Sequence, residues 1–99
     1  MRYEIRSTKN FNTWFDKIKD TAVKHKVLAR FARIENGNFG DYKQLDADLF
    51  ELRFFFGSGL RIYYTIKNDK IVLLVTGGDK SSQNKDIVKA RNILMKLED

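Results

Sequence analysis

Residues 49–80 decide the fold, and they read LFELRFFFGSGLRIYYTIKNDKIVLLVTGGDK. Three apolar runs, rich in Phe, Tyr, Ile and Val, are separated by two turn signals, Gly57-Ser58-Gly59 and Asn68-Asp69. Aromatic and β-branched residues suit a pleated, half-buried surface. Short Gly- and Asn-containing turns between such runs are typical of hairpins. The stretch therefore predicts an antiparallel meander of three strands.

The two turns give an expected register. A three-residue loop at 57–59 would pair Arg53 with Tyr63 and Arg61 with Phe55, and a two-residue loop at 68–69 would pair Arg61 with Thr76. Both turns then place one apolar set on the same face, which a one-residue slip would scatter over both faces. That predicted apolar face comprises Phe50, Leu52, Phe54, Phe56, Leu60, Ile62, Tyr64, Ile66, Ile71, Leu73 and Val75.

The opposite face of the predicted meander is neither a plain core nor a plain solvated surface, because it mixes two arginines and a tyrosine with apolar residues. The third predicted strand ends in Gly77-Gly78, and Lys80 then adds another cation near the strand end. Arg61 lies on the central strand, so we expect its guanidinium to project rigidly from the middle of the sheet into a cleft. The predicted face comprises Glu51, Arg53, Phe55, Arg61, Tyr63, Thr65, Val72, Leu74 and Thr76.

The rest of the chain supplies elements that pack against this meander. Apolar residues recurring with the period of an amphipathic helix, preceded by capping residues, indicate helices. Alternation of apolar and charged residues indicates a short strand. The prediction is a single α+β domain over residues 1–99, in the order β-α-α-β-β-β-α, with a helical hairpin on one face of an antiparallel sheet. We expect a strand at 2–6, helices near 9–19, 21–35 and 82–97, and a polar loop at 38–48.

Composition narrows the classes of function. The chain has 99 residues, no cysteine and one histidine. These counts exclude a disulfide framework, a thiolate metal site and a cysteine nucleophile, and His25 alone cannot anchor a metal. We therefore expect no metal and no cofactor. No run approaches a membrane span or a signal peptide, so we expect a cytoplasmic protein that does not bind membranes. The net charge of +6 favours an acidic partner, such as nucleic acid or an acidic protein segment.

The candidate site is a cluster of cations and tyrosines on the mixed face. Arginine forks match phosphate oxygens and can stabilise the growing charge of a phosphoryl-transfer transition state. RNA cleavage needs no metal, because the 2′-OH is the nucleophile, but it needs a proton acceptor and a proton donor. From the residues alone, passive binding of nucleic acid or of an acidic peptide is as good an interpretation as cleavage. The candidate catalytic residues are Arg53, Arg61, Tyr63 and Lys80, and the candidate RNA-binding residues are Lys43 and Tyr42.

Three segments at these positions resemble the RelE/ParE superfamily of bacterial toxins, and most closely its HigB-like addiction module killer group. They are FGDYKQL at 39–45, ELRFFFGSGLRIYY at 51–64 and IVLLVTGGDKSSQNKDIVKA at 71–90. The resemblance implies a microbial-RNase-like fold and a metal-independent endoribonuclease, an mRNA interferase that cleaves mRNA in the ribosomal A site. It also implies a helix-turn-helix antitoxin that neutralises the toxin and represses their operon, so that operator DNA is reached only through the antitoxin.

The resemblance also assigns residues. Arg53 and Arg61 match the basic sheet residues of the family, Lys80 matches its loop lysine, and Lys43 matches the basic residue ahead of the second strand. The chain departs from the pattern after Tyr64, because no later Tyr or His can be the active-site residue that many relatives carry. Two alternatives stay open. One is a ParE-type gyrase poison without RNase chemistry, and the other is an inactive member that only binds an antitoxin.

Overall fold

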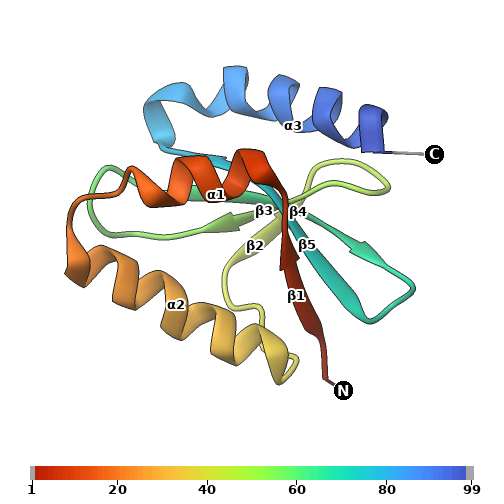
Figure 1. Ribbon diagram of the computed structural model, residues 1–99, viewed down its shortest axis with the longest axis horizontal. Coiled ribbons are helices and arrows are strands. Elements are labelled where there is room, and N and C mark those ends of the chain that lie inside the picture. Colours follow the sequence, from red (N-terminus) through yellow and green to blue (C-terminus); the bar gives the residue numbers. More distant parts are fainter. Residues whose placement is uncertain (1, 98–99) are drawn as a thin grey trace.

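A five-stranded mixed sheet with helices on both faces forms the framework of the protein, in a computed structural model that describes residues 2–97 (Figure 1). The strands lie in the order β1-β5-β4-β3-β2 across the sheet. In chain order the elements are β1 Glu4–Ser7, α1 Lys9–Asp16, α2 Thr21–Glu35, β2 Tyr42–Gln44, β3 Phe50–Arg53, β4 Arg61–Lys67, β5 Ile71–Gly78, the 3-10 turn η1 Lys80–Ser82 and α3 Gln83–Leu97.

The predicted α+β class and all three helices are confirmed, with two corrections to the sheet. Strand β1 joins the sheet as predicted, but it runs parallel to β5. A fifth strand, β2, lies within the predicted polar loop and pairs antiparallel with β3. Its residues, Tyr42, Lys43 and Gln44, are exposed at the sheet edge, so their sequence carries no alternation of apolar and polar residues.

The β3–β4 register differs from the predicted one by two residues. Arg53 lies opposite Arg61, and Glu51 lies opposite Tyr63. The predicted pairs of Arg53 with Tyr63 and of Arg61 with Phe55 are therefore wrong. The loop is longer than three residues, since it is closed by the Phe54 amide, which donates to the Leu60 carbonyl at 3.1 Å. A shift of two residues keeps every side chain on its predicted face.

The β4–β5 turn has a larger effect on which face each side chain occupies, because the register next to the turn differs from the predicted one by one residue. Asn68 and Asp69 both adopt positive φ, and Lys70 completes a three-residue turn by donating to the Lys67 carbonyl. Val72 and Leu74 therefore belong to the apolar face, where Ile71 and Leu73 were predicted. Beyond an irregularity at Tyr63/Tyr64, Tyr63 pairs with Thr76 and Arg61 lies opposite Gly78, so the predicted pair of Arg61 with Thr76 is wrong.

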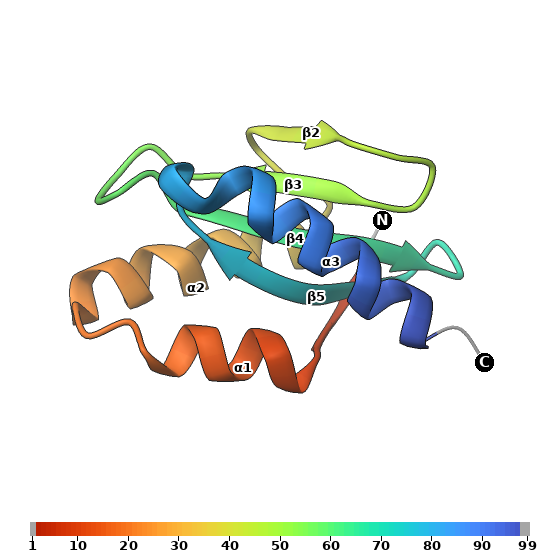
Figure 2. The ribbon, with the colours of Figure 1, turned by 90° about the horizontal axis from the view of Figure 1, so that it is seen from above.

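The sheet separates two apolar cores. Helices α1 and α2 pack on one face, over a cluster that includes Phe11, Val27 and Ile62. Helix α3 packs across β4 and β5 on the other face and leaves β2 uncovered (Figure 2). This second cluster comprises Leu49, Tyr63, Val75, Ala90 and Leu94. Within residues 2–97, none of the helices is long and apolar enough to cross a membrane.

Candidate functional site

Arg53 presents a fixed guanidinium at the end of β3. Its Nε donates to the Glu51 carboxylate at 3.0 Å, and the Gln83 amide donates to the other oxygen of that carboxylate at 2.7 Å. Glu51 is fully buried, whereas the Arg53 side chain is 32% exposed. Within residues 2–97, the Nη atoms of Arg53 make no hydrogen bond. A buried carboxylate therefore orients an arginine whose outer edge faces solvent, as recognition of a phosphate or carboxylate requires.

Arg30 of α2 fixes the main chain at the same place. Its Nη1 donates to the Arg53 carbonyl at 2.7 Å, and its other nitrogens donate to the carbonyls of Phe39 and Asp41. Burial is the main cause that lowers the pKa of Arg30. The residue thus joins α2 to β3 and to the start of β2. This role of Arg30 could not be predicted from the sequence, because main-chain acceptors leave no pattern there.

Lys80 lies against the hairpin loop formed by residues 54–60. Its amide approaches the Ser58 carbonyl at 3.5 Å, and its Cβ lies 3.3 Å from the position that a Cβ on Gly59 would occupy. The Asp79 side chain caps the η1 turn by accepting from the amides of Ser81 and Ser82, and hydrogen bonds from Ser81 and Ser82 lower the pKa of Asp79. The exposed Lys80 is thereby presented next to the hairpin that carries Arg53.

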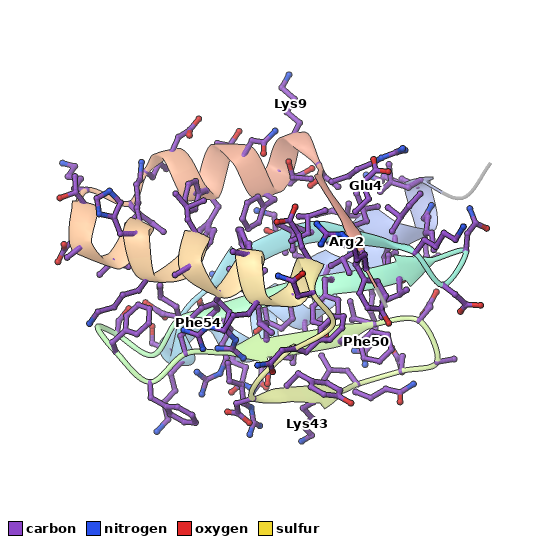
Figure 3. The ribbon with its side chains drawn as sticks, turned by 90° about the horizontal axis from the view of Figure 1, so that it is seen from below. Arg2, Glu4, Lys9, Lys43, Phe50 and Phe54 are labelled. Atoms are coloured by element: carbon purple, nitrogen blue, oxygen red, sulfur yellow. The ribbon has the colours of Figure 1, made fainter. Side chains whose placement is uncertain are left out.

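Lys43 and Tyr42 lie on opposite faces of β2, although both were predicted as RNA-binding. Lys43 pairs with Glu51 across the strands, so it shares the face of Arg53. Figure 3 shows it at the outer edge of the sheet, pointing away from α1 and α2. Tyr42 pairs with Leu52, and its ring contacts Phe39 on the side of the helical hairpin. The structure therefore brings Lys43, and not Tyr42, to the face that carries Arg53.

Arg61 is buried, so the prediction that its guanidinium projects into an open cleft is wrong. The residue is 9% exposed. Its Nη1 donates to the carbonyls of Gly59 and Leu60, both at 3.2 Å, and more weakly to that of Phe54 at 3.5 Å. The hairpin loop folds back over the side chain because β3 ends at Arg53, three residues before the predicted loop at 57–59. Arg61 therefore holds the loop in place.

Tyr63 is fully buried beneath α3. Within the described part of the chain, its hydroxyl has no hydrogen-bond partner. Burial, and then the nearby carboxylates of Glu51 and Asp86, raise the pKa of Tyr63. The phenol stays neutral and shielded from solvent, so this structure does not place it where it could exchange a proton with RNA. The sequence could not show that α3 covers this residue.

The hairpin loop exposes one aromatic ring, which has no distinctive signature in the sequence. Phe55 is 82% exposed. Phe56 is half-buried, and the ammonium of Lys26 lies 5.0 Å from its ring centroid. Phe54 is buried, with the Arg30 guanidinium 4.8 Å from its ring centroid. Aromatic rings bordered by cations are typical of surfaces that bind single-stranded nucleic acid. Among residues 2–97, no three of His, Cys, Asp and Glu are grouped as metal ligands.

Comparison with known proteins gives one family and one fold. The sequence pattern of a family described as phage-derived, Gp49-like proteins matches residues 13–94. A protein of Haemophilus influenzae, described as uncharacterized, is 41% identical over 97 residues, covering 98% of each chain. A mutant of the E. coli toxin RelE in the free state shares the fold with a TM-score of 0.73 at 12% identity, over 98% of this chain and 99% of that one.

Two solved toxin–antitoxin complexes share the fold as well. RelBE2 of Mycobacterium tuberculosis matches with a TM-score of 0.65 at 19% identity, over 81% of this chain and all of that chain. The intact E. coli RelBE complex matches with a TM-score of 0.59 at 15% identity, over 78% of this chain and 95% of that chain. At such identities the likeness establishes the fold.

Proposed function

This chain belongs to the family of phage-derived Gp49-like proteins, and from that premise we propose that it is the toxin of a toxin–antitoxin pair. The fold it shares with RelE toxins supports the proposal. The observation that carries it is the Arg53 fork, oriented by the buried Glu51 and left open to solvent, on a chain with a net charge of +6. A partner antitoxin is expected, because two of the similar structures are toxin–antitoxin complexes.

We further propose that the toxin is a ribosome-dependent mRNA endoribonuclease of the HigB-like group, neutralised by a helix-turn-helix antitoxin. In this reaction the 2′-OH of a nucleotide attacks the adjacent phosphorus, and the 5′ oxygen of the next nucleotide leaves. Arg53 would hold the phosphate and stabilise its growing charge, and Lys43 would bind the RNA backbone. Because Tyr63 is buried, we assign donation of a proton to the leaving 5′ oxygen to the Lys80 ammonium, which is exposed beside the hairpin loop, and the 2′-OH loses its proton to solvent water.

Expression of the protein without a partner is expected to stop growth by arresting translation. Incorporation of labelled methionine and labelled thymidine should be followed after induction, together with primer extension on a translated mRNA. Methionine incorporation should fall first, and new 5′ ends should appear only on translated messages. If thymidine incorporation failed first while translation continued, the gyrase-poison alternative would replace this proposal.

Replacing Tyr63 by phenylalanine is expected to leave growth arrest intact. The change removes a buried hydroxyl for which residues 2–97 provide no hydrogen-bond partner, so the free energy of unfolding should stay the same or rise by about 1 kcal/mol. The native state holds the phenol proton more tightly than the unfolded state does. Stability is therefore lost as the pH rises above about 10, where the unfolded phenol ionises. Urea unfolding should show a smaller alkaline loss for Tyr63→Phe. A natively stable variant without toxicity would restore the catalytic role of Tyr63.

A further inference from the structure

A second cationic site lies between α1 and α3, apart from the surface around Arg53. It is a hollow of about 310 Å³, bordered by Lys9 and Lys17 of α1 and Lys89 of α3, with Trp14 and Gly77 among its lining residues. Strand β4 separates β5, which carries Gly77, from β3, which carries Arg53. Its lining residues include none of Arg53, Lys43 and Lys80, so the hollow is distinct from the site proposed for RNA cleavage.

The indole of Trp14 lies directly against β5, because Gly77 has no side chain to keep it away. A Cβ at that position would lie 2.4–2.6 Å from three carbons of the indole ring. Only glycine allows the indole to lie directly on the strand. The ring is half-buried and lines the hollow, so part of its surface is open to a ligand. A rigid, partly open aromatic ring is a stacking platform for a planar group.

The border of the hollow is entirely cationic or neutral. Among the described residues, no carboxylate lines it, and none of its three lysines takes part in an ion pair. Figure 3 shows Lys9 extending from the first turn of α1 into solvent. Three unpaired ammonium groups around one indole complement a ligand that combines negative charges with a flat ring.

We propose that this hollow binds single-stranded RNA, with a base stacked on Trp14 and backbone phosphates on Lys9, Lys17 and Lys89. An acidic peptide would satisfy the lysines but would leave the indole without a planar partner, so the combination favours a nucleotide chain. The site deepens the proposed function, since it would hold RNA outside the nucleotide that is cleaved. It lies at the open end of β5, because β1 pairs only with Ile71–Leu74 of that strand.

Trp14 is the only tryptophan of the chain, so its fluorescence reports directly on this hollow. The full-length protein would be titrated with a 2′-O-methyl uridine hexamer, which cannot be cleaved, and separately with a hexaglutamate peptide. We expect saturable quenching by the hexamer and none by the peptide. With a labelled hexamer, Trp14→Ala should weaken binding about tenfold because a base loses its stacking partner. Lys89→Glu should weaken binding about tenfold because it places a carboxylate beside a phosphate. Lys96→Glu, on the same helix but outside the hollow, is the matched control.

The outcomes separate this site from the proposed catalytic one. Arg53→Ala should not change the quenching of Trp14 by the hexamer. If the parent protein proved non-toxic but its Trp14 emission were still quenched by the hexamer, the proposed function would be rejected and this site would be retained. Binding of the labelled hexamer without any change in Trp14 emission would overturn the proposal, as would quenching by hexaglutamate alone. Equal losses for Lys96→Glu and Lys89→Glu would also overturn it, because they would indicate attraction by net charge alone.

Discussion

Arg61→Ala is expected to lower the free energy of unfolding by about 3 kcal/mol, because hydrogen bonds from a charged donor contribute about 1.5–3 kcal/mol each. The variant loses the Nη1 bonds that hold the carbonyls of Gly59 and Leu60. It also leaves a void next to Phe54, whose carbonyl the same nitrogen approaches. Urea denaturation should show the loss, and amide exchange at Gly59 should accelerate because the loop is freed.

Arg61→Met separates hydrogen bonding from packing. Methionine fills the volume of the arginine stem and removes a buried charge for which residues 2–97 provide no carboxylate partner. We expect it to recover most of the lost stability while leaving the hairpin loop more mobile than in the parent. A fully stable Arg61→Ala protein with an unchanged loop would contradict the structural role assigned here. It would return Arg61 to the candidates for direct contact with RNA.

The elements were predictable from the sequence because local patterns determine them. Helix α2 spans Thr21–Glu35, the predicted range, since Asp20 caps its start and Asn36-Gly37 end it. The β3 and β4 side chains were assigned to the correct faces, because an error of two residues preserves parity. Residues 71–75 of β5 were assigned to the wrong faces, because Asn68-Asp69 resembles a two-residue turn although Lys70 belongs to the loop as well. Thr76 was assigned correctly, since it pairs with Tyr63.

The candidate site was less predictable than the fold, because burial there depends on contacts distant in sequence. Glu51 contacts Gln83 of α3, and Arg30 of α2 contacts the Arg53 carbonyl. Neither contact has a local signature. Arg53 and Arg61 are both arginines on neighbouring strands, yet one faces solvent and the other is enclosed by its own hairpin loop. The position of a cationic residue within a strand indicates the face on which its side chain lies. Only the tertiary structure shows what covers that face.

Arg53→Ala is expected to reduce cleavage and toxicity by about 10²–10³-fold, the effect typical of losing one oriented donor to transition-state charge. The hairpin should keep its geometry, because Arg30 bonds to the main-chain carbonyl of residue 53, which alanine retains. Arg53→Lys should restore little activity, since a single ammonium cannot replace the planar fork. Primer extension on translated mRNA would measure cleavage. Arg6→Ala is the control, because it removes an equal charge from an exposed arginine on β1.

Loss of stability must be separated from loss of chemistry in this experiment, because Arg53→Ala leaves the buried Glu51 carboxylate without its cation. Adding Glu51→Gln removes that negative charge and leaves an amide that can still accept from Gln83. We therefore expect the Glu51→Gln/Arg53→Ala protein to regain a melting curve close to that of the parent and to remain inactive. If growth arrest returned together with stability, Arg53 would be only a partner of Glu51, and the phosphate would have to be held by Lys80 and Lys43.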